Sequence, residues 1–274
     1  MTKPSGRQGE EYILSAEDIA RFRRDGYVTL RDVMTEAELA VIEPEFQRFM
    51  TAQVPGMGRD FCDMSSPYDR KFEDFSLVNA VLPRTYRPEL RDNVYERRAA
   101  SIARQLVGDT ATLDYDQFLA KRPGKHLAAF AWHQDLGYWP TGTPDAVTAT
   151  CSLALDDADE ENGCLAVVPG SHRQGLRPHR PMHGDDREQS HILSVELGDE
   201  DVVVRLPLRR GDIIVHDELI VHGSAGNQSP DRWRRTYIVA FRTKACVDYE
   251  RSIGFTHSHN DTIGWETHLG ALTA

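Results

Sequence analysis

Two histidines and one aspartate have the types and the spacing of a metal site. His133 and Asp135 lie two residues apart in AWHQDLGYWP, so at the end of an extended strand both side chains can point to one face. His222 ends a second apolar run, DIIVHDELIVH. Two imidazoles and one carboxylate on one face of an octahedral ion leave positions open, which suits oxygen-activating non-haem Fe(II). A structural zinc site would instead close with four protein ligands, often cysteines, and no cysteine lies near either histidine motif.

An arginine that follows His222 has the chemistry to bind a carboxylate. Arg234 lies in DRWRRTYIVAFR, a run long enough for a strand that returns beside the metal. Its planar guanidinium pairs with a carboxylate through two hydrogen bonds, which is what the far end of a metal-chelating 2-oxoglutarate requires. Arg235 is the alternative, because side chains alternate along a strand and only one of the two can face the site.

The elements that must position these residues form a helical first part and a β-rich second part. The apolar spacing predicts helices over residues 16–25, 35–50 and 92–107, with a short strand, GYVTLRDV, after the first. From about residue 110, short runs such as TLDYDQFLAK and RRTYIVAFR alternate with Gly, Pro and Asp. This pattern predicts a mainly β sandwich or jelly roll with N-terminal flanking helices.

The chain has no evident linker, and we expect one domain over residues 1–274. Within it we expect disorder over residues 1–14, a mostly helical flank and lid over 15–109, the jelly-roll core over 110–243, and a C-terminal extension over 244–274.

Composition and charge exclude several classes of function. The formal charge of -11 and the pI near 5.5 oppose binding to a phosphate backbone, so we expect no nucleic-acid partner. The N-terminus lacks the apolar run of a signal peptide, and no apolar stretch is long enough to span a membrane. We therefore expect a cytoplasmic protein that does not associate with membranes, and the sequence does not indicate its oligomeric state.

Four segments resemble motifs of the phytanoyl-CoA dioxygenase (PhyH) family, in the family's order. They are WHQDLGYWP, NGCLAVVPGSH, RRGDIIVHD and HGSAGNQSPDRWRR, and the resemblance covers roughly residues 16–243. It implies a double-stranded β-helix, the cupin-like jelly roll, with Fe(II), 2-oxoglutarate and O2 as cofactor and cosubstrates. His133, Asp135 and His222 match the family's iron ligands.

The resemblance also implies residues that contact 2-oxoglutarate. It favours Arg234 over Arg235 as the carboxylate clamp, and it matches Gln117, Ser152 and Ser224 to positions near the cosubstrate. The related iron halogenases replace the carboxylate with a small residue so that halide can bind the metal. Because this chain keeps Asp135, we expect an oxygenase.

Other histidines and arginines allow competing interpretations. His216 lies six residues before His222 and competes as a ligand, although it lacks the HGS context. His179 and His183 have helical spacing without the Glu of HExxH, which favours a surface loop over a zinc site. Nearby arginines contact either an anionic substrate or solvent: Arg173, Arg177 and Arg180.

The expected activity is oxidation of a C–H bond of a small-molecule substrate, by hydroxylation, cyclisation, epimerisation or desaturation. Loops over 52–84, 136–147 and 173–190 are expected to select that bond. Tyr138 and Trp139 are candidates for lining a substrate pocket, whereas we expect Phe130 in the core. The acidic chain without a patch for coenzyme A phosphates favours a tailoring step of bacterial secondary metabolism, as in antibiotic biosynthesis. The alternatives are an acyl-CoA hydroxylase and a cupin-like isomerase or binding protein without oxygen chemistry.

Overall fold

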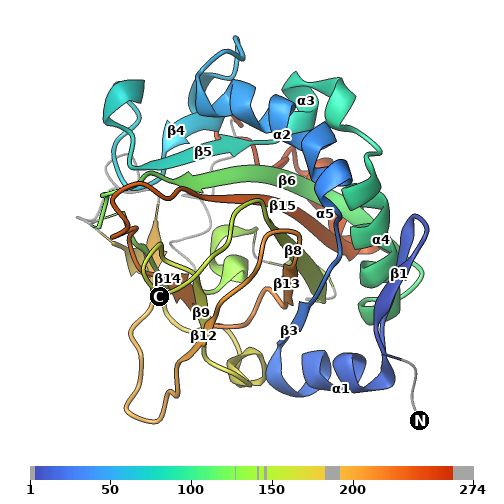
Figure 1. The fold of residues 1–274 in the computed structure, drawn as a ribbon. Helices are drawn as coiled ribbons and strands as arrows, with labels where there is room; N and C mark the ends of the chain where they lie inside the picture. The colour runs from blue at the N-terminus through green and yellow to red at the C-terminus, as the bar shows by residue number, and fades with distance from the viewer. Residues whose placement is uncertain (1–3, 127, 141, 145–146, 183–191, 262–274) are drawn as a thin grey trace.

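The structure is a computed structural model that describes residues 4–126, 128–140, 142–144, 147–182 and 192–261 (Figure 1). Two antiparallel sheets form its centre, with strand orders β3-β13-β8-β15-β6-β5-β4 and β12-β9-β14-β7. The strands of the larger sheet are β3 (Tyr27–Leu30), β13 (Ile213–His216), β8 (Thr148–Ala154), β15 (Arg234–Thr243), β6 (Ala111–Lys121), β5 (Leu77–Val81) and β4 (Phe61–Asp63). Those of the smaller sheet are β12 (Val204–Leu206), β9 (Leu165–Val167), β14 (His222–Ser224) and β7 (Phe130–His133). This arrangement confirms the expected jelly roll.

Apolar side chains from both sheets fill part of the space between them. Ile214 of β13 and Ala154 of β8 pack with Val167 of β9 in one buried cluster. Each strand therefore directs alternate side chains toward the interior of the jelly roll.

Helices cover the outer face of the larger sheet (Figure 1). They are α1 (Ala16–Asp25), α2 (Glu36–Met50), α3 (Pro83–Tyr86) and α4 (Val94–Leu106). The last helix, α5 (Lys244–Ser252), follows β15 directly, and its Glu250 pairs with Arg242 of that strand. Phe46 and Phe49 of α2 pack on Phe118 of β6 with ring centroids 4.4 and 5.2 Å apart. The three long helices that the apolar spacing predicts are confirmed, and none of the described helices is both long and apolar enough to cross a membrane.

Capping groups define where these helices begin. The Ser15 hydroxyl accepts a hydrogen bond from the backbone N–H of Asp18, and Thr35 and Glu38 form a reciprocal capping box at the start of α2. Such caps satisfy the first backbone N–H groups, which have no partner inside the helix.

Two expectations about irregular segments are wrong. Residues 1–14 were expected to be disordered, but they contain a hairpin of β1 (Gly6–Gln8) and β2 (Glu11–Ile13). Tyr12 of this hairpin is buried, and its hydroxyl donates a hydrogen bond to the carbonyl oxygen of Arg31. The segment 52–84 contains β4 and β5, which extend the larger sheet. Long-range pairing and burial, rather than local pattern, produce these strands.

Short elements complete the fold. They are the strand pair β10 (Arg180–Pro181) and β11 (Leu193–Ser194), and the 3-10 helices η1 (Gly58–Asp60), η2 (Phe72–Asp74), η3 (Pro88–Leu90), η4 (Asp135–Tyr138) and η5 (Ser171–Gln174). Of these, η4 matters for function, because it follows β7 directly and begins at Asp135.

Candidate active site

The three residues expected to bind a metal meet inside the jelly roll. His133 ends β7 and His222 begins β14, and the two are direct cross-strand partners. Their Nε2 atoms lie 3.4 and 3.5 Å from Oδ1 of Asp135, at the start of η4. The three groups offer ligand atoms within 4.8 Å of one another, which is close enough to hold one metal ion.

Backbone carbonyls orient both imidazoles. Nδ1 of His133 lies 2.7 Å from the carbonyl oxygen of Ala131, and Nδ1 of His222 lies 3.0 Å from that of Ile220. Since a carbonyl oxygen only accepts, each Nδ1 donates a hydrogen bond to its carbonyl, and this contact turns each Nε2 toward Asp135, where a metal would bind. Burial lowers the pKa of His222 well below its usual value, which keeps this imidazole neutral.

Gln134 explains why His133 and Asp135 face the same way. Its side chain points to the opposite side, where it donates to the carbonyl oxygens of Gly175 and Leu219. Its amide oxygen accepts from the backbone N–H of Arg177. The alternation that the sequence predicts for these three positions is therefore fixed by hydrogen bonds.

A cavity between the sheets, which we call the inner cavity, extends from the three metal-binding groups to Arg234. Its wall includes Gln117, Ser152, His216, Ser224 and Arg234, together with His133, Asp135 and His222. The structure thus brings all the expected site residues to one cavity. Gln117 also donates to Asn79 through a hydrogen bond of 2.5 Å.

The guanidinium of Arg234 is buried at the end of the inner cavity, and no described residue forms an ion pair with it. Its Nε has no hydrogen-bond partner among the described residues, and burial lowers its pKa to about 10. Arg235 instead faces outward and forms ion pairs with Asp156 (2.7 Å) and Glu43 (2.9 Å). A buried unpaired cation is costly, so this end of the cavity is built for an anion.

Lys121 is a second buried basic residue at this end of the site, and the sequence did not point to it. It is the register partner of Arg234 across β6 and β15, and its ammonium donates to Ser224 Oγ (2.7 Å) and to the carbonyl oxygen of Ala225. Burial, and then the charge of Arg234, lower the pKa of Lys121 well below its usual value. Lys121 lies four residues after Gln117 in TLDYDQFLAK, and this even spacing on a strand indicates that both side chains share one face.

His216 lies beside the metal-binding groups but on the other oxygen of Asp135. Its Nε2 is 3.1 Å from Oδ2, whereas His133 and His222 face Oδ1. The sequence left His216 open as a ligand, but in the structure it contacts the carboxylate of Asp135 instead of joining the cluster of three metal-binding groups.

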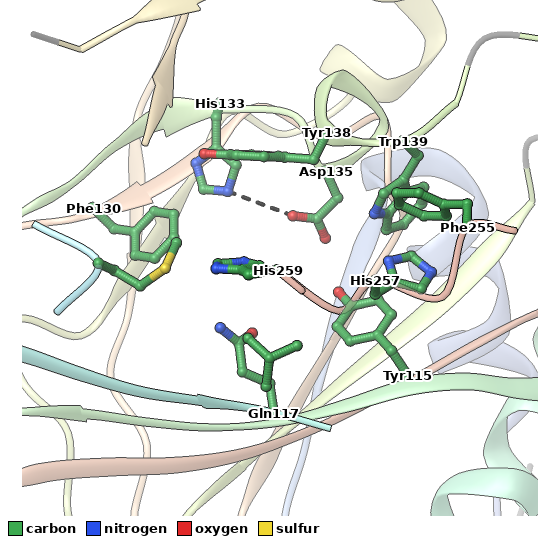
Figure 2. A pocket seen from close by; sticks show the side chains of 12 residues that line it. Tyr115, Gln117, Phe130, His133, Asp135, Tyr138, Trp139, Phe255, His257 and His259 are labelled. Carbon is green, nitrogen blue, oxygen red and sulfur yellow. Dashed lines mark ion pairs between the residues drawn. The ribbon is translucent and has the colours of Figure 1, made fainter. Parts of the chain in front are cut away.

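A second cavity, the outer cavity, meets the inner one at the metal-binding groups. Figure 2 shows His133 and Asp135 on one side of it, with Gln117 and Tyr115 opposite. Tyr138 and Trp139 line it as the sequence allowed. Phe130 packs against a buried apolar cluster, as expected, and it also lines both cavities.

Loops and the C-terminal segment around residues 255–259 together form the wall of the outer cavity. Met64 and Val81 come from 52–84, but no described residue of 173–182 lines it. Unexpectedly, the C-terminal extension contributes Phe255, His257 and His259. No motif marked these positions.

Three of the remaining candidates, His179, Arg177 and Arg180, have partners within the protein. His179 is buried rather than in a surface loop, and its Nε2 accepts from the backbone N–H of Gln134 (3.0 Å). His183 lies outside the described residues. Arg177 pairs with Asp201 (2.6 Å) and Arg180 with Glu196 (2.5 Å), which does not favour these arginines as an anion site.

Comparisons with known proteins agree with this geometry. The family model described as phytanoyl-CoA dioxygenase (PhyH) matches residues 22–236. The chain is 29% identical over 238 residues to an ectoine dioxygenase of Bordetella bronchiseptica, covering 82% of this chain and 74% of that one. It is 24% identical over 233 residues to the peroxisomal phytanoyl-CoA dioxygenase of Bos taurus, covering 80% and 66%.

A solved structure is similar over nearly the whole chain. EvdO2 from Micromonospora carbonacea var. aurantiaca has a TM-score of 0.70 at 28% identity, over 88% of this chain and 93% of that one, and it was also solved with 2-oxoglutarate. The chain therefore belongs to the phytanoyl-CoA dioxygenase (PhyH) family and is, as its sequence predicts, a dioxygenase that depends on iron(II) and 2-oxoglutarate and uses O2.

Proposed function

We propose that this enzyme oxidises a C–H bond of a ring-containing small molecule, as a tailoring step in bacterial secondary metabolism. His133, Asp135 and His222 bind the iron, and Arg234 binds the far carboxylate of 2-oxoglutarate. The observation that carries the proposal is that one inner cavity holds a cluster of two histidines and one carboxylate together with a buried guanidinium, which pairs with no anion in the described part of the chain.

The donor set fits iron(II). Two imidazoles and one carboxylate on one side of the ion leave the remaining positions to 2-oxoglutarate and O2. When bound, iron and 2-oxoglutarate together supply an oxidant that removes a hydrogen atom from a substrate C–H bond.

The inner cavity fits 2-oxoglutarate at its other end. The carboxylate that does not bind the metal pairs with Arg234, and Lys121 adds positive charge behind Ser224. Ser152 and Gln117 line the path between these ends and orient the molecule. A cupin-like isomerase or binding protein has no need of such a buried carboxylate clamp, so Arg234 favours the oxygenase.

The outer cavity places the substrate beside the metal. Its aromatic side chains provide flat apolar surfaces and exclude water from the reacting bond: Tyr115, Phe130, Tyr138, Trp139 and Phe255. Its described lining contains no lysine or arginine, which favours a compact substrate over a coenzyme A thioester with its phosphates. The ectoine dioxygenase relative bears the name of a small molecule, in agreement with this preference.

The test is substrate-stimulated consumption of 2-oxoglutarate. Purified enzyme with Fe(II) is incubated with 2-oxoglutarate, O2 and either ring-containing metabolites or fatty acyl-CoA thioesters, and succinate is quantified. We expect some ring-containing compounds to stimulate succinate formation and to gain mass or lose hydrogen. Stimulation by acyl-CoA thioesters alone would contradict the tailoring role and favour the acyl-CoA hydroxylase.

A further inference from the structure

The C-terminal segment 253–261 forms a wall of the outer cavity that lies beyond the part of the chain matched by the family model. That model ends at residue 236, whereas Phe255, His257 and His259 line the cavity. Figure 2 shows His257 beside Trp139 and Phe255 on one side of the cavity, close to Tyr115. This segment gives the pocket chemistry that family membership does not specify.

Two buried carboxylates hold His257 in place. Its Nε2 lies 2.8 Å from Oδ2 of Asp114 and 3.4 Å from Oε2 of Glu250, and both carboxylate side chains are fully buried. Its ring lies against the ring of Tyr115, with centroids 4.5 Å apart. The backbone of His257 has a φ of 70°, a left-handed conformation that is uncommon for residues other than glycine.

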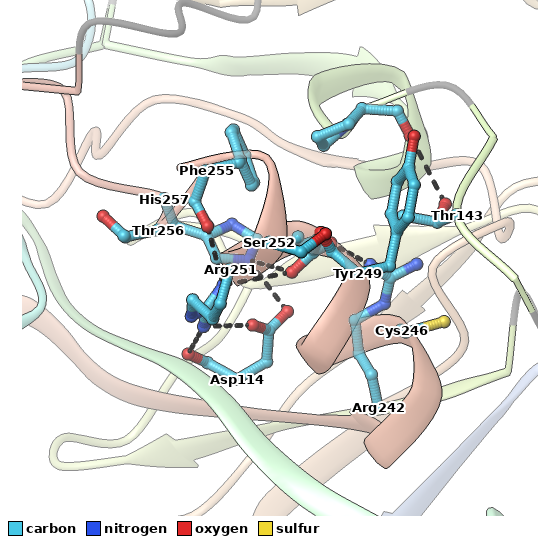
Figure 3. A network of polar contacts seen from close by, with 12 residues as sticks. Asp114, Thr143, Arg242, Cys246, Tyr249, Arg251, Ser252, Phe255, Thr256 and His257 are labelled. Atoms are coloured by element: carbon cyan, nitrogen blue, oxygen red, sulfur yellow. Dashed lines mark hydrogen bonds and ion pairs between the residues drawn. The ribbon is translucent and has the colours of Figure 1, made fainter.

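Arginines complete this network (Figure 3). Arg251 lies 2.5 Å from Asp114 and 3.2 Å from Glu250, and Arg242 forms ion pairs with Glu250 and with Glu218 (3.1 Å). Asp114, Glu250 and His257 lie close enough to hold a metal ion. However, the two arginines already supply positive charge to these carboxylates, so the cluster is an ion-pair network rather than a second metal site.

The network favours the charged form of His257. Burial alone would lower its pKa, but the charge and hydrogen bond of Asp114, reinforced by Glu250, outweigh burial and raise it. The charges facing the imidazole from neighbouring elements are Asp114 of β6 and Glu250 of α5, each of which also binds Arg251.

The other ring nitrogen of His257 has no partner among the described residues. Nε2 is committed to the carboxylates, and His257 lines a cavity whose described wall contains neither lysine nor arginine. Nδ1–H is therefore a hydrogen-bond donor that carries positive charge and is left for a ligand. The aromatic rings around it suit a flat ring system.

We propose that His257 is a substrate-binding residue whose Nδ1–H pairs with a carboxylate on a ring-containing substrate, so that the enzyme selects acids over their neutral analogues. The inference rests on the proposed function, because it assigns the outer cavity to substrate. It extends that function by naming the charge of the substrate and the residue that recognises this charge.

Matched probes test this selection. Wild-type enzyme is loaded anaerobically with Fe(II) and saturating 2-oxoglutarate, so that Arg234 is occupied. It is then titrated calorimetrically with naphthalene-2-carboxylate and, separately, with naphthalene-2-carboxamide, which has nearly the same shape without the charge. We expect the acid to bind at least about 10-fold more tightly, as for a charge-assisted hydrogen bond. Equal binding of both probes, or binding of neither, would overturn the proposal, and this comparison needs no variant.

A substitution then assigns the preference to one residue. In His257→Asn, we expect the acid and the amide to bind within about 2-fold of each other, because the charged donor is lost. Asparagine tolerates the left-handed backbone, so the segment keeps its path. His172→Asn is the matched control, since His172 contacts the carbonyl oxygen of Arg23 and lines neither cavity. An unchanged preference in His257→Asn would contradict the assignment.

The visible absorption of the loaded enzyme distinguishes failure of the proposed role of His257 from failure of the proposed function. Chelation of Fe(II) by 2-oxoglutarate gives a weak visible charge-transfer band, which we expect in wild type and in both variants. If the band forms but the probes bind equally, only the role of His257 fails. If wild type shows no band, the proposed function fails instead.

Discussion

Asp135 uses its two carboxylate oxygens for different neighbours: Oδ1 faces His133 and His222, whereas Oδ2 lies 3.1 Å from Nε2 of His216. His216 is buried on β13, in the larger sheet, so this contact connects that sheet to the start of η4. Because an aspartate oxygen only accepts when ionised, His216 donates the hydrogen bond and fixes the rotation of the carboxylate. Such outer contacts orient metal ligands.

We therefore predict that His216→Phe weakens iron binding. Loss of the donor frees the carboxylate to rotate, and the Fe(II) dissociation constant should rise by about 10- to 100-fold. Competition with a colorimetric chelator measures it. His216→Gln, which can still donate to Asp135, should lose less, and an unchanged constant in His216→Phe would show that the contact does not position Asp135.

Adjacent arginines on β15 provide a matched pair for the cosubstrate site. Arg234→Gln should raise the dissociation constant of 2-oxoglutarate by about 100-fold, since a buried charge-assisted pair is lost. Arg235→Gln removes the ion pairs with Asp156 and Glu43, which face away from the cavity, and should leave 2-oxoglutarate binding unchanged. The reverse outcome would exchange their roles.

Lys121 should make the stability of the ligand-free enzyme depend on alkaline pH. Its pKa is lowered in the folded protein, below the usual value of 10.5. Between the folded pKa and 10.5 the unfolded chain binds the extra proton, so the free energy of unfolding should rise with pH, by at most about 1.4 kcal/mol per pH unit for one proton. At pH values below the folded pKa, Lys121 is charged in both the folded and the unfolded states. The destabilisation from burying this charge is then complete, and the free energy of unfolding no longer changes with pH through this residue.

The variant Lys121→Met isolates that slope. We expect denaturant titrations across this range to show a smaller rise with pH than in wild type, and 2-oxoglutarate to bind about 10-fold more weakly at neutral pH. Identical pH profiles for the two proteins would contradict the account of a penalised buried ammonium.

Arg242 should be essential for stability. It is fully buried between Glu218 and Glu250, and burial raises the pKa of Glu218 to about 8 despite this pairing. Arg242→Met removes the arginine partner of Glu218 and one of the two arginines that pair with Glu250, and should cost about 3 to 5 kcal/mol of unfolding free energy. Lys244→Met breaks an exposed pair with Asp248 and should change stability little. Chemical denaturation of both variants measures the contrast.

The sequence predicted the parts of the site that depend on strand alternation and order. His133 and His222 lie at strand ends, Asp135 follows β7 at the start of η4, and Arg234 and Arg235 alternate on β15. Local pattern and motif order therefore sufficed to expect the cavity. Fold class followed from the same short strands.

Features that depend on distant packing were missed. The hairpin at residues 6–13 and strand β5 read as polar or irregular because their stabilisation comes from tertiary neighbours. His257 faces the cavity only because Asp114, far away in the chain, and Glu250 hold it there. No spacing rule connects these three positions.

The most direct test of the account is anaerobic titration of the Fe(II)-loaded enzyme with 2-oxoglutarate, followed by visible absorption. Chelation of the metal by the keto acid predicts a weak metal-to-ligand charge-transfer band that saturates with 2-oxoglutarate and is lost in His133→Ala. A folded, iron-loaded protein without this band, or a band that persists in His133→Ala, would contradict the assignment of iron and 2-oxoglutarate to this cavity.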